Sequence, residues 1–352
     1  GQLLNDAHHQ NKTAIEGLCK ALYDFDEQAV RAILGHLLSA DAACHFSRPI
    51  GDVESSQLYD AVFSPLRFAL PDLERRDMIC IAGSDYDKAA WVGCAGHYIG
   101  IFKTPFLGIP PTGHIAHIRF HEFFRFENGK VVEIQAIWDL PELMMQAGVW
   151  PMAPSLGREW NVPAPATQDG LNPPATHLEH TSASVQHVVD MLRALQRYPS
   201  QGGVEVMEME LYWHPHFSWY GPAGIGSSRG GDGFRNCHQQ PFLNAMPDRG
   251  QYPEEVSHHF FAEGDYVGVT GWPNMAQTIS GDGWLGIAPT HQKITLRSLD
   301  FWRLEKGLIR ENWVLVDLLD VWAQIGVDVM ARMQQLASVR PNYMMYHNGG
   351  VG

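Results

Sequence analysis

The stretch Leu107-Gly108-Ile109-Pro110-Pro111-Thr112 returns 178 positions later as Leu285-Gly286-Ile287-Ala288-Pro289-Thr290. The similarity continues without a gap as far as Gly148 and Gly326, and 15 of these 42 aligned positions are identical. About one position in twenty would agree by chance at average composition. The sequence therefore indicates a tandem duplication of one structural unit.

A second repeat lies upstream of the first, at an offset of 176. It pairs Pro65, Ala69, Pro71 and Asp72 with Pro241, Ala245, Pro247 and Asp248. The small change of offset predicts an insertion in the strands between the two anchors. A proline-rich stretch without apolar periodicity separates the copies and predicts an extended linker. The predicted organisation is a first domain at 1–150, a linker at 151–180, a second domain at 181–340 and a tail at 341–352.

Within each copy, helical periodicity precedes strand-like sequence. Apolar residues recur at helical spacing around 14–38 and 185–195, and β-branched and aromatic runs follow at 89–102, 115–126 and 131–138. Glu127-Asn128-Gly129-Lys130 predicts a tight hairpin, which Glu305-Lys306-Gly307 repeats. Helices followed by an antiparallel sheet predict an α+β fold in each copy.

Composition narrows the function. The 352 residues include 39 acidic and 25 basic ones, a net charge of -14, which argues against binding to nucleic acid. No run of about 18 apolar residues predicts a membrane span, and the first residues lack a secretory layout, so we expect a cytoplasmic protein with no membrane association. No glycine-rich nucleotide motif and no metal-ligand array occurs, so we expect neither cofactor nor metal.

One carboxyl in each copy interrupts an apolar strand face. Glu122 lies between Phe120 and Phe124 in the alternation of one strand, and Asp300 shares a face with Trp302 in the other. Such an acid must be hydrogen-bonded, paired with a cation such as Arg119, or shifted in pKa so that it can donate a proton. Glu122 and Asp300 are therefore the first candidate catalytic residues.

The assembled motifs resemble the SnoaL-like polyketide cyclase family. In copy one they are Gly96-His97, Gly108 to Gly113, Phe124 to Glu133 and Leu143 to Gln146; in copy two they are Trp219 to Gly224, Gly233 to Arg235, Pro241 to Asp248 and Glu311 to Asp317. The resemblance covers roughly 130 to 150 residues of each copy. It implies two tandem cone-shaped domains of the nuclear transport factor 2-like superfamily, each a strongly curved, mostly antiparallel sheet wrapped around a pocket and closed by N-terminal helices.

The resemblance also implies cofactor-free acid/base chemistry on a small hydrophobic carbonyl compound: aldol cyclisation, isomerisation or dehydration. Glu122 and Asp300 match the position of the oxyanion-hole acid in ketosteroid isomerase. Asp139 and Asp317 match a second acid of the wider family, and they can equally be N-caps of the closing helix. The aspartate that follows tryptophan in the cyclases is replaced here by Ala136 and Val314.

Further candidates come from histidines and large rings. The resemblance makes His97 a candidate base in copy one, with Trp272 at the equivalent place in copy two. Copy two is rich in aromatic rings that suit a pocket for a planar ligand. The predicted ligand-binding residues are Trp138, Phe124, Trp219, Tyr220, His238, Trp272 and Trp302.

Two functions remain open from the sequence. The first is a cyclase-like, isomerase-like or dehydratase-like enzyme acting on a small hydrophobic or polyketide-like ligand. The second is a protein that binds a small molecule without turning it over, or a scaffold in which one or both pockets are inactive. The tandem repeat also predicts an intramolecular pseudo-dimer of the two domains, with further homo-oligomers possible.

Overall fold

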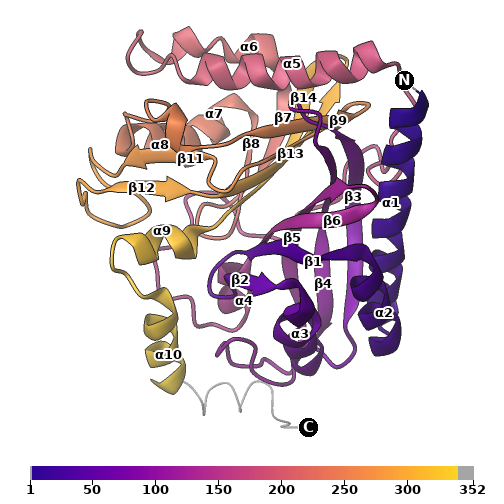
Figure 1. Ribbon diagram of the computed structural model, residues 1–352. Coiled ribbons are helices and arrows are strands. Elements are labelled where there is room, and N and C mark those ends of the chain that lie inside the picture. Colours follow the sequence, from indigo (N-terminus) through magenta and orange to yellow (C-terminus); the bar gives the residue numbers. More distant parts are fainter. Residues whose placement is uncertain (1, 340–352) are drawn as a thin grey trace. The chain divides into compact units, whose positions relative to one another are not determined.

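The computed structural model describes residues 2–339, and the chain divides into two compact units (Figure 1). The first comprises residues up to 80, 89–152 and those from 326 onwards, whereas the second comprises 81–88 and 153–325. The stretch from 326 to 339, predicted as the end of the second domain, is thus grouped with the first unit. The predicted tail at 341–352 lies outside the described residues.

The first unit begins with helices and continues as a mixed sheet of strand order β2-β1-β6-β5-β4-β3. Figure 1 shows α1 running alongside this sheet. Its elements are α1 (Gln2–Tyr23), α2 (Glu27–Leu37), β1 (Leu38–Phe46), β2 (Asp52–Glu54), α3 (Ser64–Ala69), β3 (Glu74–Ser84), β4 (Ala90–Ile101), β5 (Ile115–Glu127), β6 (Lys130–Trp138), α4 (Leu140–Gln146) and α10 (Val329–Val339). The end of β3, residues 81–84, is grouped with the second unit.

The second unit repeats this plan with the strand order β8-β7-β14-β13-β10-β9 and a small separate pair, β11-β12. Its elements are α5 (Leu178–Leu195), α6 (Met209–Tyr212), β7 (Trp213–Tyr220), β8 (Ser228–Arg229), α7 (Gly230–Phe234), α8 (Gln240–Ala245), β9 (His259–Glu263), β10 (Tyr266–Thr270), β11 (Met275–Thr278), β12 (Lys293–Leu296), β13 (Ser298–Glu305), β14 (Leu308–Val316) and α9 (Leu318–Gln324). The α+β prediction is confirmed in both copies.

Both predicted hairpins form, and their turns have the same backbone. Glu127 pairs with Lys130 and Glu305 with Leu308, which leaves a two-residue loop in each. The loop residues have positive φ, 50° and 75° at Asn128-Gly129 and 51° and 79° at Lys306-Gly307. Two successive positive φ values match the twist of antiparallel strands, so the turns set the register of the central strands.

The register also locates the predicted insertion. Cys94 pairs with Glu122 and Tyr98 with Ile118; Val269 pairs with Asp300 and Met275 with Leu296. Six positions therefore separate Val269 from Met275, against four between Cys94 and Tyr98. The two extra residues split the strand that is continuous as β4 in the first unit into β10 and β11 in the second.

The proline-rich linker is extended and packs on the second unit. Pro163 accepts a hydrogen bond from the Trp313 indole at 3.1 Å, and Ala166 donates its amide to the buried Glu311 at 3.0 Å. Val162 between these contacts is itself buried. The segment therefore covers polar and aromatic groups on the face of β14 opposite to Asn312 and Val314.

Candidate functional site

The acid of the second unit lies on one face of β13 together with Ser298 and Trp302. Register places Val269 on one side of Asp300 and Val314 on the other, so apolar side chains flank the carboxyl group. The Ser298 hydroxyl donates a hydrogen bond of 2.7 Å to Asp300. The strand thus holds a partly exposed carboxylate between two valines, with the Ser298 hydroxyl among its hydrogen-bond partners.

This face opens onto a cavity of about 440 Å³ within the second unit. Its wall combines the sheet with residues of α5, α7 and α8. Aromatic side chains supply much of the lining: Trp213, Trp219, Phe234, Phe242, Tyr252, Phe260, Trp284 and Trp302. Ligand pockets in proteins are commonly of this order of size and are lined mainly by apolar and aromatic side chains.

A histidine faces the sheet from the helical side of this cavity. His238, in a one-turn π-helical segment (Arg235–Gln239), stacks on Trp219 with ring centroids 4.2 Å apart and planes 14° apart. Burial lowers the pKa of His238 to about 3, so the imidazole is neutral at physiological pH. Its Nδ1 atom is buried without a hydrogen-bond partner among residues 2–339.

Cross-strand pairing shows where the acid lies relative to the stacked rings of Trp219 and His238. Trp302 pairs with Asn312, which pairs with Trp219, and all three line the cavity. Asp300 lies one row further along β13, with β14 between it and the strand of Trp219. At a strand spacing of about 4.8 Å, the two strands are roughly 10 Å apart. The side chains of Asn312 and Val314 line the cavity between them.

The equivalent acid in the first unit is enclosed by donors. Glu122 accepts hydrogen bonds from Arg75 at 2.5 Å, Tyr98 at 2.7 Å and the Trp138 indole at 3.0 Å. The expected cationic partner is therefore present, and it is Arg75 rather than Arg119. The cavity beside Glu122, which Phe124 also lines, is only about 10 Å³.

Two of these donors are missing from the second unit. Register places Met275 at the position of Tyr98, and Val316 at the position of Trp138. Both replacements are apolar and line the large cavity. Loss of the tyrosine and the indole leaves space where the first unit is filled, and it removes two of the groups that enclose the acid.

The candidate base His97 does not lie beside Glu122. It pairs with Arg119 in the sheet and its ring is 5.6 Å from that of His117, whereas its neighbour Tyr98 points to the face of Glu122. Burial, with smaller contributions from neighbouring cationic groups, lowers the pKa of His97 to about 3. Because Met275 aligns with Tyr98, the residue that aligns with His97 is Asn274, and the predicted equivalence with Trp272 is corrected.

Asp139 and Asp317 stand at the N-caps of α4 and α9. Asp139 accepts the backbone N–H of Glu142 at 3.3 Å, as an N-cap does. Asp317 pairs instead with Arg297, at 3.3 Å. Neither aspartate is among the residues that line the large cavity.

Only some of the predicted ligand-binding residues line the large cavity. Trp219, Trp302 and His238 line the cavity, as the prediction requires of ligand-binding residues. Tyr220 points to the opposite face of its strand and donates to Glu311 at 2.9 Å. Trp272 is outside the lining and lies under the Arg297 guanidinium, 4.6 Å away.

Several lining residues were not among the sequence candidates, notably Asn312, Gln277 and Arg249. A signal for Arg249 did exist in the repeat. Pro71-Asp72-Leu73 aligns with Pro247-Asp248-Arg249, so a buried leucine in one copy stands where the other has a cation. Comparison of the copies for such exchanges of character would have identified it.

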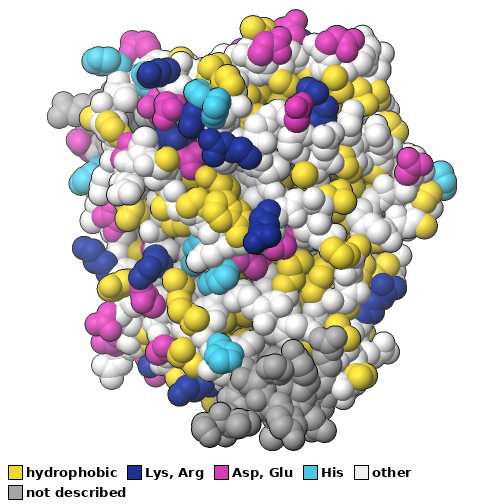
Figure 2. Space-filling view, turned by 180° about the vertical axis from the view of Figure 1, so that it is seen from behind, with side chains coloured by type: hydrophobic (Ala, Val, Ile, Leu, Met, Phe, Trp, Pro, Cys, Tyr) yellow, Lys and Arg dark blue, Asp and Glu magenta, His cyan; other side chains and the backbone are white. Residues whose placement is uncertain are grey.

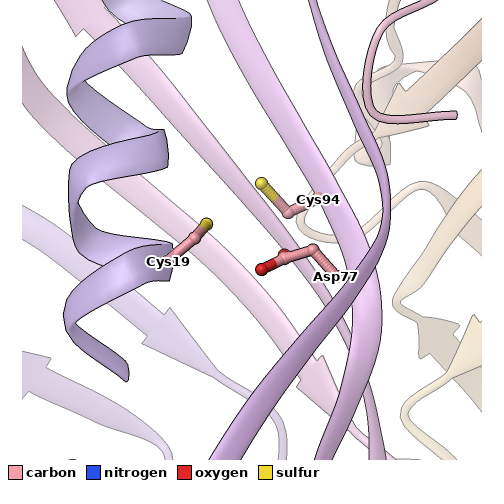
Figure 3. A group of neighbouring side chains, drawn as sticks. All are labelled: Cys19, Asp77 and Cys94. Atoms are coloured by element: carbon pink, nitrogen blue, oxygen red, sulfur yellow. The ribbon is translucent and has the colours of Figure 1, made fainter. Parts of the chain in front are cut away.

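A cluster of potential metal ligands lies in the first unit, where Cys19 on α1 faces Asp77 and Cys94 on β3 and β4 (Figure 3). Their ligand atoms lie within 4.8 Å of one another. However, the Arg75 guanidinium already binds the Asp77 carboxylate at 3.0 to 3.2 Å. A hydrogen bond with Cys94 and burial raise the pKa of the Cys19 thiol, which disfavours the thiolate that a metal needs. We assign no ion to this cluster.

Charged side chains on one face of the molecule, and the apolar character of the helices, complete the description. Figure 2 shows Lys and Arg side chains interspersed with Asp and Glu on the face that it presents. Among the described residues, no helix combines the length and the apolar character needed to cross a membrane.

Comparison with known proteins identifies the family. The model of the SnoaL-like polyketide cyclase family matches residues 18–147 and 190–325, so the chain belongs to this family and carries two copies of its domain. The predicted resemblance and the cone-type α+β fold are thereby confirmed. No curated protein matches the chain significantly.

Solved structures of the family are similar to single copies. A proposed SnoaL-like polyketide cyclase from Jannaschia sp. CCS1 is 21% identical, with a TM-score of 0.34, over 39% of this chain and 91% of its own. AclR, a proposed hydroxylase from Streptomyces galilaeus, is 21% identical, with a TM-score of 0.34, over 40% of this chain and 97% of its own. IdmH, a proposed polyketide cyclase from Streptomyces antibioticus, is 21% identical, with a TM-score of 0.32, over 40% and 99%.

Proposed function

We propose that the second domain carries out cofactor-independent proton transfer on a small hydrophobic carbonyl compound, and that the first domain is its structural partner. The observation that carries this proposal is the contrast between the two acids. Asp300 faces a cavity of about 440 Å³, whereas Glu122 is saturated by three donors beside a space of about 10 Å³. The scaffold alternative then applies to the first domain.

Asp300 takes the role of the family's missing aspartate. In the alignment of the sequence motifs, that aspartate stands at Val314, which is the direct cross-strand neighbour of Asp300. Side chains opposite each other on antiparallel strands have Cβ atoms about 5 Å apart, so a carboxylate on β13 reaches nearly the same part of the pocket. Asp300 would remove the proton from the carbon next to a carbonyl group and return it later in the reaction.

His238 suits the role of a neutral partner. A pKa of about 3 makes it a poor base, and it leaves an uncharged ring that can donate one hydrogen bond to a carbonyl oxygen. Stacking on Trp219 holds the ring in place. The developing enolate would thus be stabilised by a donor on the helical wall while the carboxylate works from the sheet.

A binding protein without turnover is the second candidate function. Val314 replaces the aspartate that the cyclases use. The second copy therefore lacks a carboxyl group that the family uses for aldol cyclisation. Binding alone would still use the cavity and its aromatic lining. The two functions differ in whether Asp300 accelerates a proton transfer.

Exchange of the α-protons of 2-tetralone in D₂O, followed by NMR, separates these functions. The protein should accelerate the exchange, and Asp300→Asn should reduce this acceleration by about a hundredfold or more. Glu122→Gln is the matched control, because it makes the corresponding change in the filled pocket, and it should leave the rate unchanged. If the probe binds but exchanges no faster than in buffer, the binding function is correct. Dependence on Glu122 rather than Asp300 would show that the active domain is the first one.

A further inference from the structure

The charged residues that line the large cavity are unevenly distributed. Within the described part of the chain they are Asp300 on the sheet and two arginines, Arg193 and Arg249. Arg193 lies in the last turn of α5, and Arg249 follows α8. In a chain with a net charge of -14, two arginines that line one cavity and form no ion pair among the described residues call for a physical explanation.

Arg249 is held at the end of α5 by backbone groups. Its guanidinium donates to the carbonyl oxygens of Leu195 and Tyr198, and among residues 2–339 it forms no ion pair. A guanidinium has five N–H donors, so these two bonds leave others available. The carbonyl groups at a helix C-terminus also favour a cation there, which orients the side chain without neutralising it.

Burial lowers the pKa of Arg249 to about 10, so the side chain is still cationic at neutral pH. A partly buried cation without a counter-charge is costly, and an anion that reaches it removes that cost. Arg193 is exposed at the same wall and, within the described chain, takes part in no ion pair. Together they offer the planar donors that bind a carboxylate.

The repeat shows that this charge is specific to the second copy. Leu73, buried in the first domain, aligns with Arg249. The fold therefore accommodates an apolar residue at this position, and a helix-capping arginine is not a requirement of the architecture.

We propose that the second domain selects ligands that join an apolar ring system to an anionic group, with Arg249 and Arg193 binding that anion. This inference rests on the proposed function, since it assigns a ligand class to the same cavity. The ring system would lie among the aromatic side chains. The anionic group would extend to the end of α5, away from the like charge of Asp300.

Calorimetric titration with three probes tests the proposal: 2-naphthoate, its methyl ester, and 2-tetralone. Naphthoate should bind at least about tenfold more tightly than the ester, and 0.5 M NaCl should weaken only the naphthoate. Arg249→Leu, which installs the residue of the first copy, should abolish this preference while the affinity for the ester stays the same. Arg249→Lys should keep part of it.

Arg197→Gln is the matched control, because Arg197 lies just beyond α5, contacts Glu208 and Val206, and is outside the cavity lining. This variant should retain the full preference for naphthoate. If ester and acid bind equally to the wild type, or if Arg249→Leu lowers thermal stability without changing the preference, Arg249 is only a helix cap and the inference is wrong. Binding of the ester or of 2-tetralone in that case would leave the proposed function intact. Failure of all three probes to bind would overturn both.

Discussion

Glu122 in the first domain and Asp300 in the second occupy the same register position on equivalent strands, yet their surroundings differ. Glu122 meets a guanidinium, a phenol and an indole, whereas valines flank Asp300, which accepts a hydrogen bond from Ser298. In the first copy the acid is a structural centre of the core. In the second the same position remains open to a cavity. The two copies therefore share one position for an acid and differ in the volume beside it, about 10 Å³ in the first and about 440 Å³ in the second.

The largest expected effect comes from removing the cation of the first domain. Arg75→Met leaves the carboxylates of Glu122 and Asp77 buried without their guanidinium, whose side chain is 0% exposed. Loss of one partner from a buried ion pair costs about 3–5 kcal/mol. Hydrogen exchange measured by mass spectrometry should show reduced protection in β5 and unchanged protection in β13.

The control for that experiment is Arg31→Met, which removes the ion pairs of Arg31 with Glu27 and Asp60, where the arginine is 47% exposed. Exposed pairs contribute at most about 1 kcal/mol, so protection in β5 should hardly change. An equal loss of protection from both variants would contradict the central structural role of Arg75.

A second prediction converts the open pocket into the filled one. Val316→Trp introduces the indole that Trp138 supplies in the first domain, where it donates to the acid. The ring should occupy part of the cavity and weaken the binding of 2-tetralone by about thirtyfold, as measured by NMR titration. Leu211→Trp, at a side chain that is 55% exposed and outside the cavity, is the control and should bind normally. Unchanged affinity in Val316→Trp would place the ligand elsewhere.

A third prediction concerns pH, because each domain contains a histidine whose pKa burial lowers to about 3. Burial lowers the pKa of His97 and of His238 to about 3, against 6.5 in the unfolded chain. The unfolded state therefore binds more protons, and stability is complete above about pH 6.5 and falls as the pH approaches 3. Between pH 7 and pH 5 each histidine should cost about 1–2 kcal/mol of stability.

Urea titrations at both pH values, with hydrogen exchange to separate the domains, measure this effect. His97→Gln should flatten the pH dependence in β5 only, and His238→Gln in β13 only. If both variants kept the acid sensitivity of the wild type, other groups would be responsible for it.

The smallest expected effect comes from the hairpin turns. Asn128 and Lys306 stand at the same turn position with φ of 50° and 51°, which asparagine adopts more readily than lysine. Lys306→Asn should stabilise the second domain by up to about 1 kcal/mol, and Asn128→Lys should destabilise the first by a similar amount. Thermal unfolding curves of the two variants check this; shifts of the same sign would contradict it.

Much of the fold could be predicted because its signals are local or repeated. The hairpins follow from Asn128-Gly129 and Lys306-Gly307, and the strand faces follow from alternation around Glu122 and Asp300. The change of repeat offset from 176 to 178 also predicted the insertion, which the register places between Val269 and Met275. The linker was expected as an extended segment, and its contacts with Trp313 and Glu311 had no signal in its proline-rich composition.

The candidate site was predictable only in part. Asp300, Trp219, Trp302 and His238 do meet at one cavity, but His97 lies on the other face from Glu122. Arg75, the partner of Glu122, lies 47 residues away in sequence, in β3, a strand that the sequence pattern did not predict. Trp272 was misaligned because the two inserted residues shift the register just before Met275.

The sequence by itself determined the duplication, the α+β class, the family and the position of one acid in each copy. These properties depend on periodicity and on identity between aligned positions, both of which can be determined from the order of the residues alone. Only the tertiary structure decided that Glu122 is saturated and Asp300 is open. The outcome depends on which side chains from distant strands fill the volume around the acid: Tyr98 and Trp138 in one copy, Met275 and Val316 in the other. Packing between side chains that are distant in sequence, rather than any local pattern, fills the space beside the acid in the first copy and leaves a cavity in the second.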